Sequence, residues 1–102
     1  MSEEIAGFEW DPFKAQINAA KHGVSFVAAS NTMLGVTLTR PALEEHENRF
    51  ASIGINEGRL IVVIWTPRHD VMRIISARRA RRYEREAYRQ AIRQAGGVAD
   101  AD

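Results

Sequence analysis

The sequence contains no cysteine, so it can form no disulfide bridge and can offer no thiolate to a metal ion. It also lacks any apolar run near the ~20 residues that a membrane-spanning helix requires. The longest such run, Leu60 to Trp65, has the length of a buried strand. The N-terminal stretch MSEEIAGFEW is acidic and lacks a secretory signal pattern. We therefore expect a cytoplasmic protein without a membrane anchor.

Histidine is scarce as well, with three residues at positions 22, 46 and 69. They are scattered, and neither HxxxH nor HxH spacing occurs, so we expect no metal site and no other cofactor. A glycine-rich phosphate loop is also missing, which argues against nucleotide hydrolysis.

What is present suits one small globular unit. The chain has 102 residues, and its apolar content of 45% is close to the average of globular proteins. It shows no repeat and no linker. We expect a single domain over residues 1–102, with a frayed tail from about residue 96 onward, after the helix-ending Gly96-Gly97 pair.

Charge is distributed unevenly behind a net value of +1. Residues 1–67 carry five basic and eight acidic groups, whereas residues 68–93 carry nine arginines against three acidic groups. The densest stretch is RIISARRARRYEREAY, residues 73–88. Segregation of this kind suggests a polyanionic ligand or an acidic protein partner.

Helix signals divide the first third of the chain. A short strand at 8–10 precedes Asp11-Pro12, an N-cap followed by a proline that loses no hydrogen bond at the first helical position. Gly23 suits the left-handed residue that ends this helix. Ser25 can cap a second, short helix that buries Phe26.

Apolar patterns predict strands at 36–39, 49–55, 60–66 and 71–77, of which 60–66 is apolar on both faces and suits a central position. From Arg79 to Gln94 the period becomes helical. We expect the buried stripe of that last helix to comprise Ala80, Tyr83, Ala87, Ala91 and Ile92. The order β-α-α-β-β-β-β-α predicts an α+β fold. Two N-terminal helices and one C-terminal helix would pack on a mainly antiparallel sheet.

Three motifs, in order along the chain, resemble a known family. The first is F-E-W-D-P-x-K-x-x-x-N-x-x-K-H-G-V-S-F at residues 8–26, the second E-x-R-x-x-x-I-G at 47–54, and the third R-I-I-S-A-R-R-A-x-x-x-E at 73–84. They resemble the BrnT toxins of type II toxin–antitoxin systems. The resemblance implies a RelE-like fold and a ribonuclease that blocks translation. It also implies a BrnA-type antitoxin, which would reach operator DNA through its own ribbon-helix-helix portion.

Metal-free RNA cleavage requires a base for the 2′-hydroxyl, cations for the phosphorane and an acid for the leaving oxygen. Arginine suits the second task because its planar fork binds phosphate oxygens in pairs, and it is a poor base because it stays protonated. We expect Arg49, Arg73 and either Arg78 or Arg79 to surround one phosphate. Glu47 is the expected proton carrier.

His22 is a further catalytic candidate, although its place at a helix end slightly favours a structural role. The RNA path is expected to include Lys14, Lys21, Arg79, Arg82 and Tyr88, the last by stacking on a base. Each arginine has an ordinary alternative as a solvated surface group or an ion-pair partner of Glu44, Glu45 or Glu84. Tyr88 could likewise rest against the sheet.

Three functions remain open at this point. The first is an endoribonuclease toxin acting on RNA, free or as ribosome-bound mRNA. The second is a non-catalytic nucleic-acid-binding module, and the third a module that binds only the antitoxin.

Overall fold

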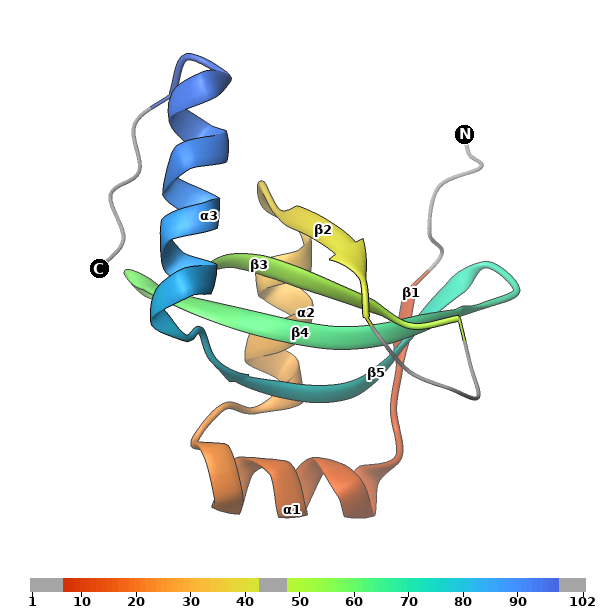
Figure 1. Ribbon diagram of the computed structural model, residues 1–102. Helices are drawn as coiled ribbons and strands as arrows, with labels where there is room; N and C mark the ends of the chain where they lie inside the picture. The colour runs from red at the N-terminus through yellow and green to blue at the C-terminus, as the bar shows by residue number, and fades with distance from the viewer. Residues whose placement is uncertain (1–6, 43–47, 98–102) are drawn as a thin grey trace.

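The computed structural model describes residues 7–42 and 48–97, and its elements follow the predicted order (Figure 1). They are β1 (Gly7–Glu9), α1 (Pro12–His22), α2 (Phe26–Met33), β2 (Leu38–Pro41), β3 (Phe50–Asn56), β4 (Arg59–Arg68), β5 (Val71–Arg79) and α3 (Arg82–Gln94). The expected α+β class, with two helices before the main strands and one after, is confirmed. Glu47 and its neighbours Glu44, Glu45 and His46 lie outside the described residues.

The strands form one sheet in the order β1-β5-β4-β3-β2. β1 pairs with β5 in parallel, and the other neighbours are antiparallel. A two-residue turn joins β3 to β4, with Glu57 at φ 52° and Gly58 at φ 79°. Positive φ at both positions is what a type I′ hairpin turn requires. The hairpin therefore returns β4 beside β3 without a break in pairing.

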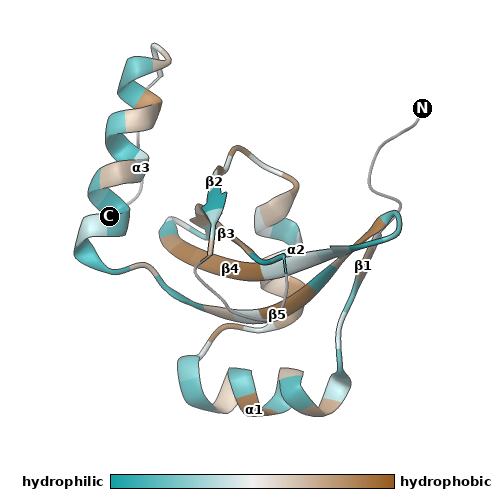
Figure 2. Ribbon diagram, turned by 45° about the vertical axis from the view of Figure 1, so that its right-hand side comes forward, coloured by the Kyte–Doolittle hydropathy of each residue, from teal (hydrophilic) through white to brown (hydrophobic). Residues whose placement is uncertain are grey.

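Apolar side chains from both faces of β4 explain how the layers pack (Figure 2). Ile61 and Val63 face α1 and α2, while Leu60 and Val62 face α3. A strand that is apolar on both faces belongs in the middle of a sheet, and β4 has that position. Within 7–42 and 48–97, no helix is both long and apolar enough to span a membrane.

Side-chain caps fix where the first two helices begin. Asp11 Oδ1 accepts hydrogen bonds from the backbone N–H groups of Phe13 (2.9 Å) and Lys14 (3.2 Å). Ser25 Oγ accepts one from Ala28 N–H at 3.0 Å. Gly23 has φ 72°, and its N–H bonds Ala19 O at the end of α1. These sequence-based helix limits are confirmed.

Asn18 holds α1 onto β5. Its Nδ2 donates to Val24 O (3.0 Å) and Ala77 O (2.9 Å), while its Oδ1 accepts from Ala77 N–H (3.2 Å) and Ser76 Oγ (3.3 Å). β1 pairs with β5 only at residues 71–73, so the Asn18 amide bonds the backbone of Ala77 on the edge of β5 that faces away from β4. This buried contact fixes the distance between the helix and the strand that together carry the site described below.

The last helix corrects one prediction. β5 continues to Arg79 and α3 begins at Arg82, three residues later than expected. Tyr83 is 60% exposed and Tyr88 only 3% exposed, so the buried side runs through Glu84, Tyr88 and Ile92 at intervals of four. The expected stripe is confirmed at Ala80 and Ile92. It was wrong at Tyr83 because it assumed an apolar first turn, whereas Glu84 is buried there against an arginine.

A basic cleft as candidate active site

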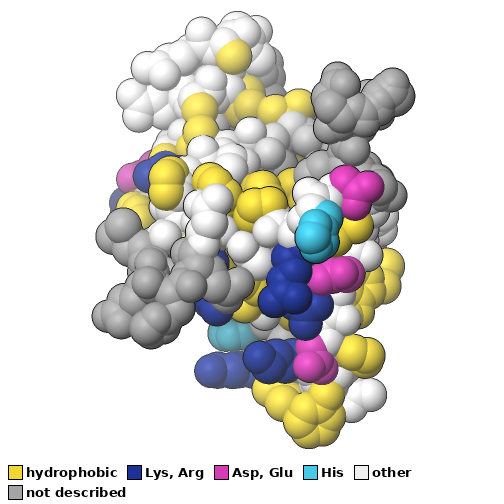
Figure 3. Space-filling view, turned by 90° about the vertical axis from the view of Figure 1, so that its right-hand side faces the viewer, with side chains coloured by type: hydrophobic (Ala, Val, Ile, Leu, Met, Phe, Trp, Pro, Cys, Tyr) yellow, Lys and Arg dark blue, Asp and Glu magenta, His cyan; other side chains and the backbone are white. Residues whose placement is uncertain are grey.

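A polar cleft of about 180 Å³ lies between α1 and β5. It is lined by Asp11, Lys14, Arg49, Arg68, Arg73, Ile74 and Ile75, and we call it the basic cleft. Four cationic side chains and one carboxylate give it a formal balance of +3. Figure 3 shows Lys and Arg side chains gathered on the lower part of this face, with Asp and Glu side chains among them. A positive balance in a concave site favours an anionic ligand.

Sheet topology brings these cations together from distant parts of the sequence. β3 and β5 both run antiparallel to β4, so the start of β3, the end of β4 and the start of β5 lie at one end of the sheet. Arg49 directly precedes β3, Arg68 ends β4, and Arg73 is the third residue of β5. Lys14 comes from the first turn of α1. The structure thus places Arg49 and Arg73 together, as the sequence predicted.

Arg73 is held in place by its neighbour on β1. Arg73 and Glu9 are cross-strand partners, and Arg73 Nη1 donates to Glu9 Oε2 at 2.9 Å. Both side chains are partly exposed, so this ion pair adds little to stability. A guanidinium has five N–H donors, so one bond leaves most of its capacity for a phosphate.

Arg78 does not belong to this group. It pairs with Glu84, with side-chain exposures of 19% and 10%, as the ion-pair alternative anticipated. Arg78 lies five residues beyond Arg73, which is about 16 Å along a strand. The hydrogen bonds that Arg78 donates to the Glu84 carboxylate raise the pKa of Arg78. Its charge is therefore compensated locally and away from the basic cleft.

Arg79 and Arg82 also lie elsewhere. Arg79 lines a different pocket with Arg59 and Glu57. Arg82 is highly exposed on α3 and lies 3.4 Å from Glu86. The structure therefore does not bring Arg78 or Arg79 to Arg49 and Arg73 as expected. Lys14 and Arg68 line the basic cleft with those two arginines instead.

A second depression, of about 340 Å³, lies beside the basic cleft along α1. Its lining is Lys14, Ile17, Asn18, Lys21, His22, Ile75 and Ser76, and we call it the α1 pocket. Lys14 and Ile75 line both cavities. The structure thus brings His22 and Lys21 beside the basic cleft, although neither lines it.

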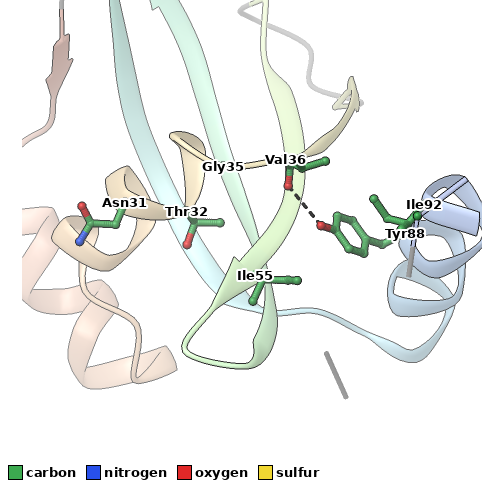
Figure 4. Close-up of a pocket in the computed structure, with 8 residues that line it drawn as sticks. Asn31, Thr32, Gly35, Val36, Ile55, Tyr88 and Ile92 are labelled. Carbon is green, nitrogen blue, oxygen red and sulfur yellow. Dashed lines mark hydrogen bonds between the residues drawn. The ribbon is translucent and has the colours of Figure 1, made fainter. Parts of the chain in front are cut away.

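Tyr88 has a structural role in place of the expected stacking role. Its hydroxyl donates to Val36 O at 3.2 Å, and burial raises the pKa of Tyr88. The ring closes one side of an apolar groove of about 400 Å³ (Figure 4). The groove is lined by Asn31, Thr32, Gly35, Val36, Ile55, Tyr88, Ile92 and Gly97. A ring that is almost fully buried offers no free face to a base, so the expected RNA contact of Tyr88 is corrected.

Arg68 is the cleft residue that sequence reasoning missed. It sits at the end of β4, opposite Val71 in the β4–β5 hairpin, so the hairpin register was the signal that could have located it. Asp11 was recognised only as a helix cap, yet it also lines the cleft. Among residues 7–42 and 48–97, no three His, Asp or Glu side chains are grouped so that they could hold a metal ion.

Comparison with known proteins identifies the family. The family model described as "Ribonuclease toxin, BrnT, of type II toxin-antitoxin system" matches residues 10–84. The chain belongs to the BrnT family. The crystal structure of the Brucella abortus ribonuclease toxin BrnT is similar at 30% sequence identity and a TM-score of 0.63, covering 74% of this chain and 97% of that chain. No curated protein matches the chain.

The BrnT match includes every residue of the basic cleft and ends at Glu84, early in α3. The motif resemblance is therefore confirmed over the segment that carries the cleft. A type II toxin–antitoxin family implies an antitoxin partner for this BrnT-family chain, and the family's description as ribonuclease toxins supports ribonuclease activity in general.

Proposed function

We propose that this BrnT-family chain is an endoribonuclease that cleaves RNA without a metal ion and thereby inhibits translation in the cytoplasm. One observation carries the proposal. Lys14, Arg49, Arg68 and Arg73 come from four separate segments and line one concave site. Cations that merely cover a surface need not converge, whereas a phosphorane requires cations on several sides.

The first step of the proposed reaction is an internal transesterification that consumes no water. The 2′-oxygen attacks phosphorus and loses its proton, the O2′–P bond forms, and the P–O5′ bond breaks as O5′ gains a proton. The products are a 2′,3′-cyclic phosphate and a 5′-hydroxyl. Arg49, Arg68 and Arg73 would hold the non-bridging oxygens, where charge develops.

Two residues remain candidates for proton transfer. Glu47 precedes Arg49 by two positions and lies outside the described residues. His22 lines the adjacent α1 pocket. A carboxylate is suited to take the 2′ proton, and an imidazole can either take or give one near neutral pH.

The decisive assay uses purified chain and single-stranded RNA in excess EDTA. We expect cleavage to persist and to yield cyclic phosphate ends, and Arg73→Ala to slow it at least about tenfold through lost charge stabilisation. Arg40→Ala is the matched control, because Arg40 is exposed on β2 at the opposite edge of the sheet. If the RNA stays intact under all conditions, including with ribosomes present, the result would contradict ribonuclease activity and favour a non-catalytic nucleic-acid-binding module.

We further propose a BrnA-type antitoxin as the partner, with operator DNA contacted only through it. The apolar groove favours a contact there, since Leu34, Val36 and Ile55 leave apolar surface exposed at or beside it. α3 borders the groove and carries four arginines against two glutamates. This combination fits an acidic, amphipathic segment of the antitoxin.

A pair of exposed valines tests this contact. Val36→Asp puts a charge in the groove and should weaken antitoxin binding about a hundredfold or more, because burying an unpaired charge is costly. Val27→Asp is the control, since Val27 is exposed on α2 away from the groove. Equal affinities of the two variants for the antitoxin, measured by calorimetry, would show that the antitoxin binds a surface other than the groove.

A further inference from the structure

The α1 pocket and the basic cleft are adjacent depressions with different chemistries. Both are lined by Lys14 and Ile75. On one side of these residues lie three arginines, and on the other lie Ile17, Lys21 and His22. The arginine side is suited to a phosphate group. The other side combines an aliphatic surface with a cationic rim, which a phosphate alone does not require.

An aliphatic surface beside an imidazole is suited to a flat, apolar ring face. Ile17 is 52% exposed on α1, and Ile75 is half-buried on β5 across from it. Nucleobases bind single-strand-specific proteins by laying their faces on such side chains, while cations follow the backbone. Lys14 is placed to contact a phosphate whose attached nucleoside occupies the α1 pocket.

Asn18, which lines the α1 pocket, has no free hydrogen-bond donor or acceptor in its side chain for the edge of a base. Its two Nδ2 hydrogens go to Val24 O and Ala77 O, and its Oδ1 accepts from Ala77 N–H and Ser76 Oγ. A side-chain amide has two donors and two acceptor positions, so all four are used. Asn18 therefore reads no base edge, and the aliphatic surface of Ile17 and Ile75 contacts a base by shape and stacking, which discriminate weakly between bases.

We propose that the α1 pocket is a nucleoside subsite next to the scissile phosphate, and that it accepts any base that is free of a duplex. This inference rests on the proposed function and adds its substrate class: unpaired RNA of at least two nucleotides, bound along α1. A base in a duplex is stacked on both faces and cannot enter.

The test separates base binding from cleavage. The probes are 2′-O-methyl tetranucleotides, which lack the nucleophile, in one complete form and four forms with a single abasic position. We expect one abasic position to weaken binding to the natural chain about tenfold, the scale of a lost base contact. Ile17→Ser should remove most of that difference and Ile17→Phe should enlarge it.

Phe13→Ser is the matched control. Phe13 is 70% exposed on the same helix and lines neither cavity, so its loss should leave the tenfold difference intact. Circular dichroism and urea midpoints verify folding of each variant. A cleaving chain whose abasic penalty is the same in Ile17→Ser as in the natural chain overturns the subsite alone. A natural chain that neither binds the complete probe nor cleaves RNA overturns the proposed function with it.

Discussion

Arg78 and Glu84 are joined by two parallel hydrogen bonds, from Nη1 to Oε1 and from Nη2 to Oε2, each 2.8 Å long. Glu84 Oε1 also accepts the N–H of Arg81 at 2.7 Å. The carboxylate therefore ties the end of β5 to the first turn of α3. An arginine that looks like a phosphate ligand in the sequence thus fixes the junction of strand and helix.

This pair should make stability depend on pH. Burial raises the pKa of Glu84, but hydrogen bonds from Arg78 and Arg81 N–H, together with their charges, outweigh it and lower the pKa overall. The stability that ionised Glu84 contributes is fully present above about pH 4.3, the pKa of glutamate in the unfolded chain. It is lost as pH falls through the lowered pKa of Glu84 in the folded chain. Glu84→Gln should lower the free energy of unfolding by about 3 kcal/mol at pH 7, with a smaller loss near pH 3. Urea titrations at both pH values measure this.

The control is Arg82–Glu86, an exposed ion pair within α3. Arg82 and Glu86 are 86% and 64% exposed, so Glu86→Gln should change the free energy of unfolding by less than about 0.5 kcal/mol at either pH. A Glu84→Gln loss no larger than that of Glu86→Gln would show that the buried pair stabilises nothing.

The second prediction concerns the salt dependence of RNA binding. Arg68→Ala should reduce the slope of log affinity against log salt by about 0.7, as expected when one phosphate contact to a single strand is lost. Stability should not change, because Arg68 is exposed. The slope is obtained by measuring the affinity for uncleavable RNA at salt concentrations from about 50 to 200 mM. A slope equal to that of Arg40→Ala would remove Arg68 from the phosphate site.

Much of the fold could be predicted because its limits are local. The Asp11 cap, the left-handed Gly23 and the order of strands β3 to β5 follow from local sequence patterns, and each was confirmed. The start of α3 was misplaced because it depends on Arg78, six residues before Glu84 and on another element. Hydrophobic periodicity cannot anticipate that a glutamate is buried by such a partner.

The site was predicted less completely for a related reason. Arg49 and Arg73 were expected together because each belongs to a predicted strand of one sheet, and in the structure both lie near the start of a strand. The choice between Arg78 and Arg68 as their companion depended on the β4–β5 register, which has an irregularity between Ile64 and Trp65. A bulge shifts which side chains face a given side, and the sequence does not mark its position.

The third prediction addresses the clamp between α1 and β5. Asn18→Ala removes four hydrogen bonds and leaves the N–H and C=O of Ala77 without this partner, so we expect a loss of about 2 to 4 kcal/mol. Amide exchange at Ala77 should accelerate more than at Val63 in the centre of the sheet. Asn31→Ala, at an exposed site on α2, is the control and should cost less than about 0.5 kcal/mol. Equal losses at the two positions would contradict a clamping role.

The fourth prediction concerns the closest approach of α2 to the sheet. A Cβ added at Gly54 would lie 2.7 Å from Thr32 Cγ2 and 3.1 Å from Thr37 Cγ2. Thr32 is buried and its hydroxyl bonds Ala28 O, so it cannot turn aside. Gly54→Ala should therefore cost about 1 to 3 kcal/mol by overpacking.

A double-mutant cycle identifies the cause of that loss. Thr32→Ser keeps the hydroxyl and removes Cγ2, so adding it to Gly54→Ala should recover about 1 kcal/mol relative to additive effects. Gly7→Ala, where an added Cβ meets nothing within 4 Å, should be nearly neutral. Strict additivity would locate the strain at Thr37 or in the strand backbone. In that case Thr37 or the backbone of β3 would be the reason why this position of the second motif, within β3, requires glycine.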